Sequence, residues 1–453
     1  MLKIIIVGCG KIGGTILESL TEEGHNVIAV DNDPEVIGEL TNIYDVIGVC
    51  GNGTDCDVLD EAGVSDAEMF VAATSSDELN MLSCYLAKKM GAKHTIARIR
   101  NPEYNLKSLG FLRQQLDLSM AINPEMLAAK EMFNILKLPS AVKIETFSAR
   151  NFEIIELILK ESSALTGIKL MDLRNKFKAK FLICVVRRGN EVYIPDGNFV
   201  LYPGDKIGLT AEPSEIQKLM RALGIDKKQA KSVMILGGSR IAFYLSKMLI
   251  AAGNSVKIIE RDEERCNEFS DSLDKAIVIH GDGAQQELLL EEGLDSIDAF
   301  VSLTGMDEEN ILISIFASTH GVPTVISKVN RNELADMASK LGLDCVISPK
   351  EIVTDVIVQY ARALENSLGS NVETLYNIMD GKAEVLEFNV RSDFKQIGIK
   401  LKDMKLKSGI LIAGIIRERR PIIPTGDDVI LNNDKVIILA ADQRLNDLSD
   451  IIK

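Results

Sequence analysis

The feature that most constrains the fold is an internal repeat that spans the two halves of the 453-residue chain. A short apolar run, Lys3–Val7, leads into the turn Gly8-Cys9-Gly10-Lys11-Ile12-Gly13, and Ser232–Leu236 leads into Gly237-Gly238-Ser239-Arg240-Ile241-Ala242. A duplication of this length indicates two copies of one nucleotide-binding unit, and therefore paired sites. The correspondence continues at nearly constant spacing: Asp31 with Glu260, Gly51-Asn52-Gly53 with Gly281-Asp282-Gly283, Thr74 with Thr304, Asp77-Glu78-Leu79-Asn80 with Asp307-Glu308-Glu309-Asn310, and Arg98 with Lys328.

The length and composition of the chain restrict its class. A chain of 453 residues is too long for one compact core and suits three or four domains. Its residues are 46% hydrophobic and 26% charged, which is typical of a folded soluble protein. The net charge is −15 and the basic residues are scattered along the sequence, so we expect no nucleic-acid partner.

The cysteines and histidines indicate neither a disulfide framework nor a metal site. The seven cysteines include no CxxC pair, so we expect reduced, buried thiols of a cytosolic protein, and the four histidines stand at no metal-ligand spacing. Because a predicted strand begins at Lys3, we expect no signal peptide. The longest apolar runs, such as Ile311–Ala317 and Ile410–Ile416, fall far short of the roughly 20 residues that span a bilayer. We expect a chain that does not cross a membrane but can sit against one.

The first 124 residues alternate short β-branched runs with helical patterns such as Ile12–Glu23 and Asp77–Met90. This alternation predicts an α/β, Rossmann-like doubly wound domain over residues 1–124, with its ligand crevice beyond the carboxyl ends of the strands. The repeat predicts a second such domain over residues 231–349. The expected strands of the first copy are Lys3–Val7, Asn26–Val30, Asp45–Val49, Met69–Ala73, His94–Arg98 and Leu118–Ile122.

An amphipathic helix follows each of these domains, Glu125–Leu138 in the first copy and Lys350–Leu364 in the second. Neither helix has an obvious sheet left to cover in its own domain. Exchange of these helices between neighbouring N-domains would remove their apolar faces from water, at about 25 cal/mol per Å² of apolar area. We therefore expect the helices to contact the other copy or other chains.

A small α+β module follows each N-domain, over residues 142–226 and again over residues 372–453. Phe152–Leu159, Phe181–Val186 and Glu191–Ile194 are its predicted strands in the first copy. The turns Pro195-Asp196-Gly197 and Pro424-Thr425-Gly426 recur at the spacing of the repeat. Asp226–Lys231 is polar and aperiodic and is the expected linker between the halves. Arg187-Arg188 and the run Arg417 to Arg420 fit a solvated hairpin turn about as well as an anion site.

The first glycine-rich turn has the residue types that dinucleotide binding requires. Gly8 permits a tight strand-to-helix turn, Gly10 lets a pyrophosphate approach the backbone, and Gly13 lets the helix pack on the strand. The N-terminus of the following helix offers free N–H groups to the phosphates. A structural turn alone would also favour glycine, but here the turn follows a strand, opens a helix and is followed by an acid at the end of the next strand.

That acid, Asp31, is expected to accept hydrogen bonds from the adenosine ribose hydroxyls and to repel a 2′-phosphate, which favours NAD(H) over NADP(H). The alternative is a solvated aspartate, or a cap for the helix after Pro34. Arg98 ends the fifth strand. Its guanidinium group either binds the pyrophosphate through two parallel hydrogen bonds or forms a surface ion pair.

Small residues follow the ends of the third and fourth strands. Gly51 and Asn52, with Gly53, follow the third strand, where a larger side chain would press on adenine, although a simple turn explains them nearly as well. Thr74-Ser75-Ser76 follows the fourth strand, where hydroxyl groups suit phosphate or ribose. Capping of the helix from Asp77 accounts for part of this run.

The second copy departs from the first in its turn and its fifth strand, at positions that matter for binding. Ser239 stands in place of Gly10, Ala242 in place of Gly13, and Lys328 in place of Arg98. Glu260 retains an acidic side chain at the position of Asp31. We expect the same fold with a different affinity or nucleotide preference, either a working second site or a purely structural one. Neither C-domain offers a convincing proton donor for hydride transfer, so we predict no catalytic residue.

The tandem order of two nucleotide-binding units, each with a small C-domain, resembles the Trk potassium-uptake regulatory subunits, which carry RCK domains. The GxGxxG turn, the strand-end acid, Gly51-Asn52-Gly53-Thr54-Asp55 and Thr74-Ser75-Ser76-Asp77-Glu78 carry this resemblance, which covers essentially the whole chain. It implies a cytoplasmic peripheral subunit on the inner face of the cell membrane that gates a potassium translocator by binding nucleotides. It also implies a homotetramer that supplies a ring of eight N-domains.

By the resemblance, the first NAD(H) site comprises Gly8 to Ile12, Asp31, Thr74-Ser75 and Arg98. The second site is matched less closely, and ATP or ADP is an alternative ligand there. Two other classes are weighed against this one: an NAD-dependent oxidoreductase with a duplicated Rossmann core, and a stand-alone redox or energy sensor acting on another transporter. The second site comprises Gly237, Gly238, Ser239, Arg240, Ile241, Glu260, Gly281, Asp282, Thr304 and Lys328.

We predict that the first site binds NADH and discriminates against NADPH, because Asp31 is followed by Asn32-Asp33-Pro34, which offers no cation to a 2′-phosphate. A hydrogen bond to a charged acceptor contributes roughly 1.5–3 kcal/mol, so Asp31→Ala should weaken NADH binding about tenfold to a hundredfold. Calorimetry with both cofactors measures this, and equal affinity of the unaltered chain for NADPH would contradict the prediction.

Overall fold

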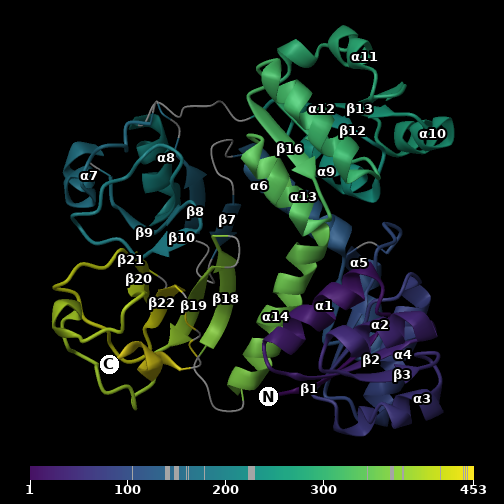
Figure 1. Cartoon of the computed structure of the whole chain (residues 1–453), viewed down its shortest axis with the longest axis horizontal. Coiled ribbons are helices and arrows are strands. Elements are labelled where there is room, and N and C mark those ends of the chain that lie inside the picture. Colours follow the sequence, from purple (N-terminus) through teal and green to yellow (C-terminus); the bar gives the residue numbers. More distant parts are fainter. Residues whose placement is uncertain are drawn as a thin grey trace. The chain divides into compact units, whose positions relative to one another are not determined.

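The computed structural model describes residues 1–453 except 105, 138–142, 147–152, 160, 162, 178, 223–229, 344, 368–371, 380, 381, 419, 442, 444 and 446. The expected linker Asp226–Lys231 therefore lies mostly outside the described residues. Leu138 at the end of an expected helix, Phe152 at the start of an expected strand and Arg419 in the arginine run also lie outside them. The chain forms two compact units, and each unit takes one segment from each repeat. The first unit is Met1–Phe133 with Ser232–Ala361, and the second is Asn134–Lys231 with Arg362–Lys453 (Figure 1).

The first unit contains two six-stranded parallel sheets, one from each repeat. Their strand orders are β3-β2-β1-β4-β5-β6 and β14-β13-β12-β15-β16-β17, which confirms the doubly wound fold predicted for both copies. The elements of the first copy are β1 (Lys3–Val7), α1 (Lys11–Glu22), β2 (Asn26–Asp31), α2 (Pro34–Ile43), β3 (Ile47–Cys50), α3 (Cys56–Glu61), η1 (Val64–Asp66), β4 (Met69–Ala72), α4 (Asp77–Met90), β5 (His94–Arg98), α5 (Leu106–Gln115), β6 (Met120–Ile122) and α6 (Pro124–Lys137).

The second copy of the first unit repeats this order element by element. Its elements are β12 (Ser232–Leu236), α9 (Arg240–Ala251), β13 (Ser255–Glu260), α10 (Glu263–Ser272), β14 (Ala276–His280), α11 (Gln286–Glu291), η2 (Leu294–Ser296), β15 (Ala299–Ser302), α12 (Asp307–Thr319), β16 (Thr324–Lys328), α13 (Asn332–Lys340), β17 (Val346–Ile347) and α14 (Pro349–Ser367).

The central strands of both sheets are buried on both faces, which is why they read as continuous apolar runs in the sequence. Ile4, Ile5 and Ile6 of β1 are fully buried, and Phe70 and Phe300 fill equivalent positions on β4 and β15. The sixth strand of the first copy is shorter than predicted. Leu118 donates its N–H to the carbonyl of Arg113 and so closes α5 instead of entering the sheet.

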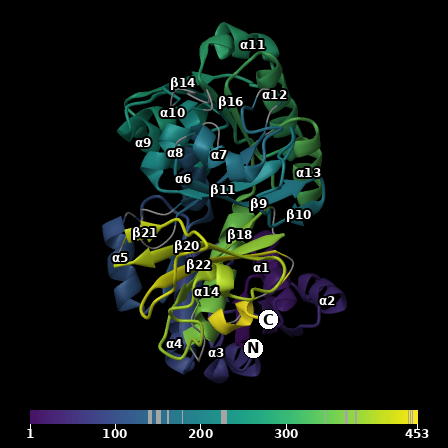
Figure 2. The ribbon, with the colours of Figure 1, turned by 90° about the vertical axis from the view of Figure 1, so that its left-hand side faces the viewer.

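Helix α14 extends from the second copy along the first, in both views of the molecule (Figures 1 and 2). The Tyr360 hydroxyl lies 3.0 Å from Nδ1 of His94, the first residue of β5, and the two rings meet edge to face. Burial and the nearby Lys88 and Lys93 lower the pKa of His94, which favours the neutral ring. The expected contact of a terminal helix with the other copy is therefore present for α14.

The second unit contains two five-stranded antiparallel sheets, with strand orders β10-β9-β11-β8-β7 and β18-β19-β22-β20-β21. They are the small modules predicted after each N-domain, and their strands pair antiparallel. In the first module, the elements are β7 (Lys143–Thr146), β8 (Glu153–Ile158), α7 (Leu170–Phe177), β9 (Phe181–Arg188), β10 (Glu191–Tyr193), β11 (Lys206–Ala211) and α8 (Pro213–Ala222). In the second, they are β18 (Val372–Ile378), β19 (Ala383–Asn389), η3 (Leu401–Asp403), β20 (Ile410–Arg417), β21 (Arg420–Ile422), β22 (Lys435–Ala441) and η4 (Leu448–Ile451).

The two antiparallel sheets share one hydrophobic core. Ile154 and Val185 of the first module pack with Val385, Ile437 and Leu439 of the second. Each module keeps a separate core on its other face, beneath its own helices and loops. The C-domains are therefore two halves of one folded unit (Figure 2).

A buried carboxylate also joins the two modules. Oε1 of Glu156 accepts the backbone N–H of Met379 from the other repeat at 2.7 Å, and Oε2 pairs with Nζ of Lys206 at 2.7 Å. The second copy carries the equivalent pair between the buried Glu387 and the partly exposed Lys435. A buried charge is tolerated when it is paired and hydrogen-bonded in this way.

One arginine of each run, Arg188 and Arg417, is hydrogen-bonded inside its own hairpin. Nε and one terminal nitrogen of Arg188 donate to the two oxygens of Asp205, both at 2.8 Å, and Arg417 binds Asp434 in the same way. The same guanidinium groups donate to the carbonyls of Val200 and Val429. Of the two readings of these arginines, the geometry favours a structural role over an anion site.

We predict that Leu439→Ala destabilises the C-terminal unit by about 2–5 kcal/mol, because it opens a cavity in the shared core. Leu431→Ala in the same module is the matched control, since Leu431 is 39% exposed and should change stability by less than about 0.5 kcal/mol. The midpoint of urea unfolding measures both. Equal effects of the two substitutions would contradict the burial of Leu439 in this core.

Candidate nucleotide site

The first glycine-rich turn has the backbone conformation that its sequence predicts. Gly8 adopts φ +83°, and a Cβ at this position would come within 2.7 Å of Thr74. A Cβ at Gly13 would lie 1.9 Å from the carbonyl oxygen of Gly8, so α1 can pack on β1 only with glycine here. At Gly10 a Cβ would meet nothing within 4 Å, which leaves open space over the N-terminus of α1. The three expected roles agree with this geometry.

Asp31 is oriented by the backbone of the turn. Its Oδ2 accepts the N–H of Cys9 at 2.7 Å, and its Oδ1 accepts the N–H of Asp33 at 3.0 Å. Asp33 itself caps α2, so the alternative reading of Asp31 as a helix cap is wrong. The carboxylate fixes the shape of the turn and still lines the cleft described below. The Cys9 side chain points inward, toward the carbonyls of Ile6 and Val30.

Glycines at the end of β3 are required by packing within the domain. A Cβ at Gly51 would lie 2.5 Å from Val58, and a Cβ at Gly53 would lie 2.1 Å from Val7. The expectation that a larger side chain would press on adenine is not needed to explain them. Gly51, Asn52 and Gly53 nevertheless line the cleft, so they form part of its wall.

The end of β4 is fixed by a buried amide. Oδ1 of Asn80 accepts both the N–H and the hydroxyl of Thr74, at 2.8 and 2.7 Å, and its Nδ2 donates to the carbonyl of Arg98 at 2.9 Å. Asn310 makes the matching bonds to Thr304 and Lys328. Ser76 caps α4 by accepting the N–H of Leu79. Ser75 and Thr74 remain on the cleft wall.

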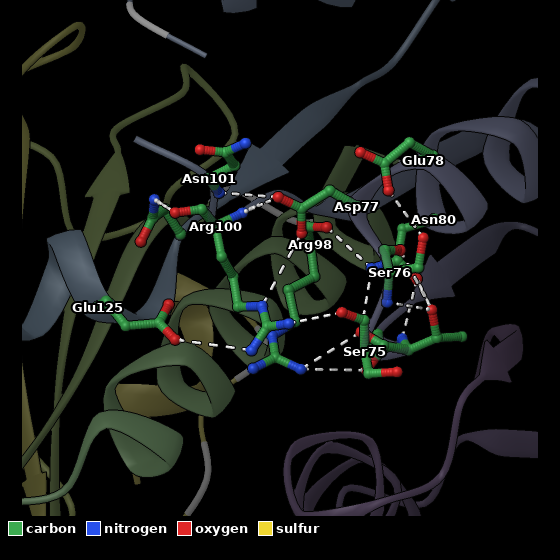
Figure 3. Close-up of polar contacts among 12 residues, drawn as sticks. Ser75, Ser76, Asp77, Glu78, Asn80, Arg98, Arg100, Asn101 and Glu125 are labelled. Carbon is green, nitrogen blue, oxygen red and sulfur yellow. Dashed lines mark hydrogen bonds and ion pairs between the residues drawn. The ribbon is translucent and has the colours of Figure 1, made fainter. Parts of the chain in front are cut away.

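Arg98 and Arg100 bring two cations to the end of β5 (Figure 3). A terminal nitrogen of Arg98 lies 3.4 Å from the carbonyls of Ala73 and Thr74, and its buried Nε has no hydrogen-bond partner. Burial and the neighbouring Arg100 lower the pKa of Arg98. Arg100 lies 3.8 Å from Asp77 and 4.0 Å from Glu125. Because Arg98 lines the cleft described below, an anion in that cleft would meet its guanidinium group.

These groups line one continuous cleft of about 2050 Å³ that both copies of the first unit share. Pockets for a single ligand usually measure about 300–1,000 Å³, so this cleft has room for more than one. The glycine-rich turns of both copies face it. The first copy contributes Gly8, Gly10, Lys11, Ile12, Asp31, Gly51, Asn52, Thr74, Ser75, Arg98 and Glu125, and the second contributes Gly238, Ser239, Arg240, Ile241, Gly305, Met306, Asp307, Lys328, Arg331 and Lys350.

Of its predicted site, the second copy contributes to the cleft only the residues expected to lie near the phosphates. Glu260, 8% exposed, accepts the N–H of Gly238 within its own turn and that of Asp262 at 2.8 Å. Among the described residues, the cleft lining contains none of Glu260, Gly281, Asp282, Thr304 and Gly237. Ser239 caps α9 with its own hydroxyl, which accepts the N–H of Ala242.

The cation that replaces Arg98 in the second copy is also engaged internally. Nζ of Lys328 donates to the carbonyl of Thr304 at 2.5 Å. Burial lowers the pKa of Lys328, while Asp307 and Glu125 act in the opposite direction. Glu125 belongs to the first copy, so charges from one copy act on the site of the other.

Glu125 lines the cleft, and Asn80 and Arg100 hold Thr74 and Ser75 of its wall, although none of the three stands out in the sequence as a site residue. Glu125 follows Pro124 at the start of α6, where an acid usually only complements the helix dipole. Its counterpart in the repeat is Lys350, and this reversal of charge was the available signal. Asn80 and Asn310 were aligned by the repeat, but their bonds to two strand ends could not be read from spacing.

The cysteine expectation needs one correction. All seven thiols are free, but Cys50 and Cys56 are exposed and not buried, because Cys50 ends an edge strand and Cys56 begins α3. Within the described residues, no three His, Cys, Asp or Glu side chains are placed to share a metal ion. None of the helices in the described part of the chain has the length and apolar character needed to cross a bilayer.

Comparison with known families agrees with this architecture. The TrkA-N domain family matches residues 4–124 and 233–349, which contain the two glycine-rich turns, and the TrkA-C domain family matches residues 154–224 and 385–453. The chain belongs to the TrkA family. A Trk system potassium uptake protein TrkA homolog of Archaeoglobus fulgidus is 30% identical over 452 residues, covering 100% of both chains.

Other TrkA relatives and solved structures extend the similarity over the full length. The Trk system potassium uptake protein TrkA of Vibrio alginolyticus is 30% identical over 450 residues, covering 98% of this chain and 96% of the relative. The fold is similar to that of the GsuK channel bound to NAD, with a TM-score of 0.63 at 18% identity, covering 97% of this chain and 77% of the channel.

We predict that iodoacetamide at pH 8 modifies Cys50 and Cys56 in the folded protein and leaves Cys9 unmodified. Burial, with the nearby Asp31 charge, raises the pKa of Cys9 to about 12, so the thiolate is scarce below that pH. At pH 8 only about one Cys9 in ten thousand would be ionised, and the thiolate is the reactive form. Peptide mass spectrometry before and after unfolding in urea measures the labelling. Labelling of Cys9 at the rate of Cys50 in the folded chain would refute the prediction.

Proposed function

We propose that this chain is a nucleotide-binding regulatory subunit that gates a membrane potassium transporter. The observation that carries the proposal is the single cleft lined by both glycine-rich turns of the chain. A ligand that contacts both copies in such a cleft can bias their relative orientation. The names of the TrkA relatives as potassium uptake proteins support transport of potassium as the process that is regulated.

NAD(H) is the proposed ligand of the first site. The open space at Gly10 and the N-terminus of α1 suit a pyrophosphate, and Arg98 brings a guanidinium group with an unused buried donor. Asp31 is placed at the end of β2, where a ribose would meet a carboxylate and a 2′-phosphate would be repelled. The NAD complex of the similarly folded GsuK channel is consistent with this choice.

The second site is proposed to bind more weakly, or to prefer ATP or ADP. Its turn faces the cleft through Ser239 and Arg240, while Glu260 is buried against the backbone of its own turn. An adenosine ribose would have to reach a carboxylate that is only 8% exposed, whereas Asp31 lines the cleft. A ligand held mainly through its phosphates would not, because Arg240 and Lys328 already line the cleft.

Gating is proposed to follow from unequal affinity of the nucleotide for two arrangements of the paired copies. A ligand shifts such an equilibrium only by its difference in affinity between the two states. We assign no catalytic residue, because the charged groups of the cleft hold strand ends and helix starts, as Asp77 does for the N–H groups of Arg100 and Asn101. The chain is proposed to act as a homotetramer that forms an eight-unit ring, peripheral to the inner face of the membrane and bound to the translocator without nucleic acid.

We predict that light scattering reports about four times the 49.7 kDa chain mass and that NADH changes the affinity of this assembly for its potassium translocator. Potassium flux into proteoliposomes, measured with and without NADH, tests the regulatory role. Asp31→Ala should move the NADH effect to about tenfold to a hundredfold higher NADH concentration, in line with its weaker binding. A monomer at micromolar concentration, together with flux that is indifferent to NADH, would contradict the proposal.

A further inference from the structure

One side chain of the second copy is hydrogen-bonded directly beside the first nucleotide site. The hydroxyl of Tyr244, on α9, donates to the carbonyl of Arg100 at 3.1 Å and accepts from Nδ2 of Asn123 at 3.0 Å. Asn123 also donates to the Arg100 carbonyl at 3.3 Å. We call these three residues the Tyr244 bridge. It joins α9 to the segment between β5 and α6 of the other copy.

The bridge connects two elements that both face the shared cleft. Tyr244 follows Arg240 by one helical turn, and Arg240 begins α9 beside the second glycine-rich turn. Arg100 follows Arg98 by two residues, and its own side chain donates to the carbonyl of Ser75 at 2.5 Å. One turn of helix and two residues of chain therefore separate the bridge from the phosphate end of each site.

The surroundings of the bridge restrict its movement. The ring of Tyr244 meets that of Phe243 edge to face, and Phe243 packs in the same way on Phe269. The backbone N–H of Arg100 is bound by Asp77 at 2.8 Å, and Oδ1 of Asn123 accepts the N–H of Met126 at the start of α6. Movement of α9 must therefore either carry the end of β5 with it or break the hydrogen bonds of the Tyr244 hydroxyl.

Within the described residues, the repeat provides no equivalent bridge in the opposite direction. Thr15 occupies the position of Tyr244 on α1, and its hydroxyl donates to the Lys11 carbonyl in its own helix. Ser348 stands where the first copy has Asn123. A tyrosine side chain that only stabilised paired copies would be expected in both repeats, whereas this one links a single pair of elements.

We propose that the Tyr244 bridge couples the two nucleotide sites, so that ligand in the first site alters the N-terminus of α9 in the second. The proposal rests on the proposed function, since it needs a nucleotide in the first site. Tyr244 acts as a positioning residue: it touches the Arg100 backbone and not the ligand. Coupling between sites is reciprocal, so a ligand at α9 alters the first site through the same bridge.

Hydrogen exchange of the full-length chain, with NADH at a concentration that fills the first site and leaves the weaker second site empty, and without NADH, tests the proposal. In the unaltered chain, NADH should slow exchange both in residues 8–20, around the first turn, and in residues 240–249 of α9. Typical coupling factors predict a slowing of about fivefold in α9. In Tyr244→Phe the α9 response should disappear, while the response of residues 8–20 and the NADH affinity remain.

Tyr360→Phe is the matched control, because Tyr360 also carries a hydroxyl contact between the copies, to His94 at 3.0 Å, away from the cleft. It should keep both responses to NADH. Exchange of Leu245 and Leu249, the buried residues of α9, reports whether Tyr244→Phe is folded without nucleotide. If that variant is unfolded there, Asn123→Ala, which removes one bond of the bridge, replaces it and should reduce the α9 response.

The possible outcomes separate the bridge from the proposed function. An unaltered chain in which NADH slows neither segment would refute the NADH site itself. An unaltered chain that responds only in residues 8–20, or a folded Tyr244→Phe that keeps the α9 response, would refute the bridge. Loss of the α9 response in both tyrosine variants would show that general docking of the copies, and not this bridge, transmits the effect.

Discussion

The structure depends on sheets that are apolar on both faces. In the C-terminal unit, one face of each five-stranded sheet is covered by its own helices and loops, and the other is covered by the sheet of the opposite repeat. Neither module could leave its second face in water, because several fully buried branched side chains would become exposed on it. Pairing of the two repeats is therefore a condition of folding for this unit.

Pairing has a different character in the N-terminal unit. Each parallel sheet already has helices on both faces, so each N-domain has a complete core of its own. The copies meet through α14, the Tyr244 bridge and the charged walls of the cleft, contacts that include specific polar pairs. Such contacts are easier to rearrange than a shared apolar core. This contrast suits a molecule in which one unit holds the repeats together while the other responds to ligand.

The cleft shows how a duplicated sequence can produce unequal sites. Each strand-end acid binds the backbone of its own glycine-rich turn, but Asp31 is shorter than Glu260 and lines the cleft, whereas Glu260 is buried. Gly10 leaves the start of α1 open, while Ser239 fills part of the same space and caps α9. Single substitutions at corresponding positions thus redirect a site without changing the fold around it, because both copies keep the same strand order and the same buried asparagine.

The sequence by itself determined the two Rossmann-like domains, most element boundaries, and the positions of Gly8, Gly13 and Asp31, because these follow from local periodicity and from backbone conformations that only glycine adopts readily. It also placed Thr74 and Arg98 at strand ends. Only the tertiary structure decided that the two C-domains share one core, that Glu125 lines the cleft together with Arg98, and that Glu260 is buried and does not line it. These features arise from contacts between residues far apart in the chain, and the spacing along a single sequence carries no record of which distant side chain completes a hydrogen bond.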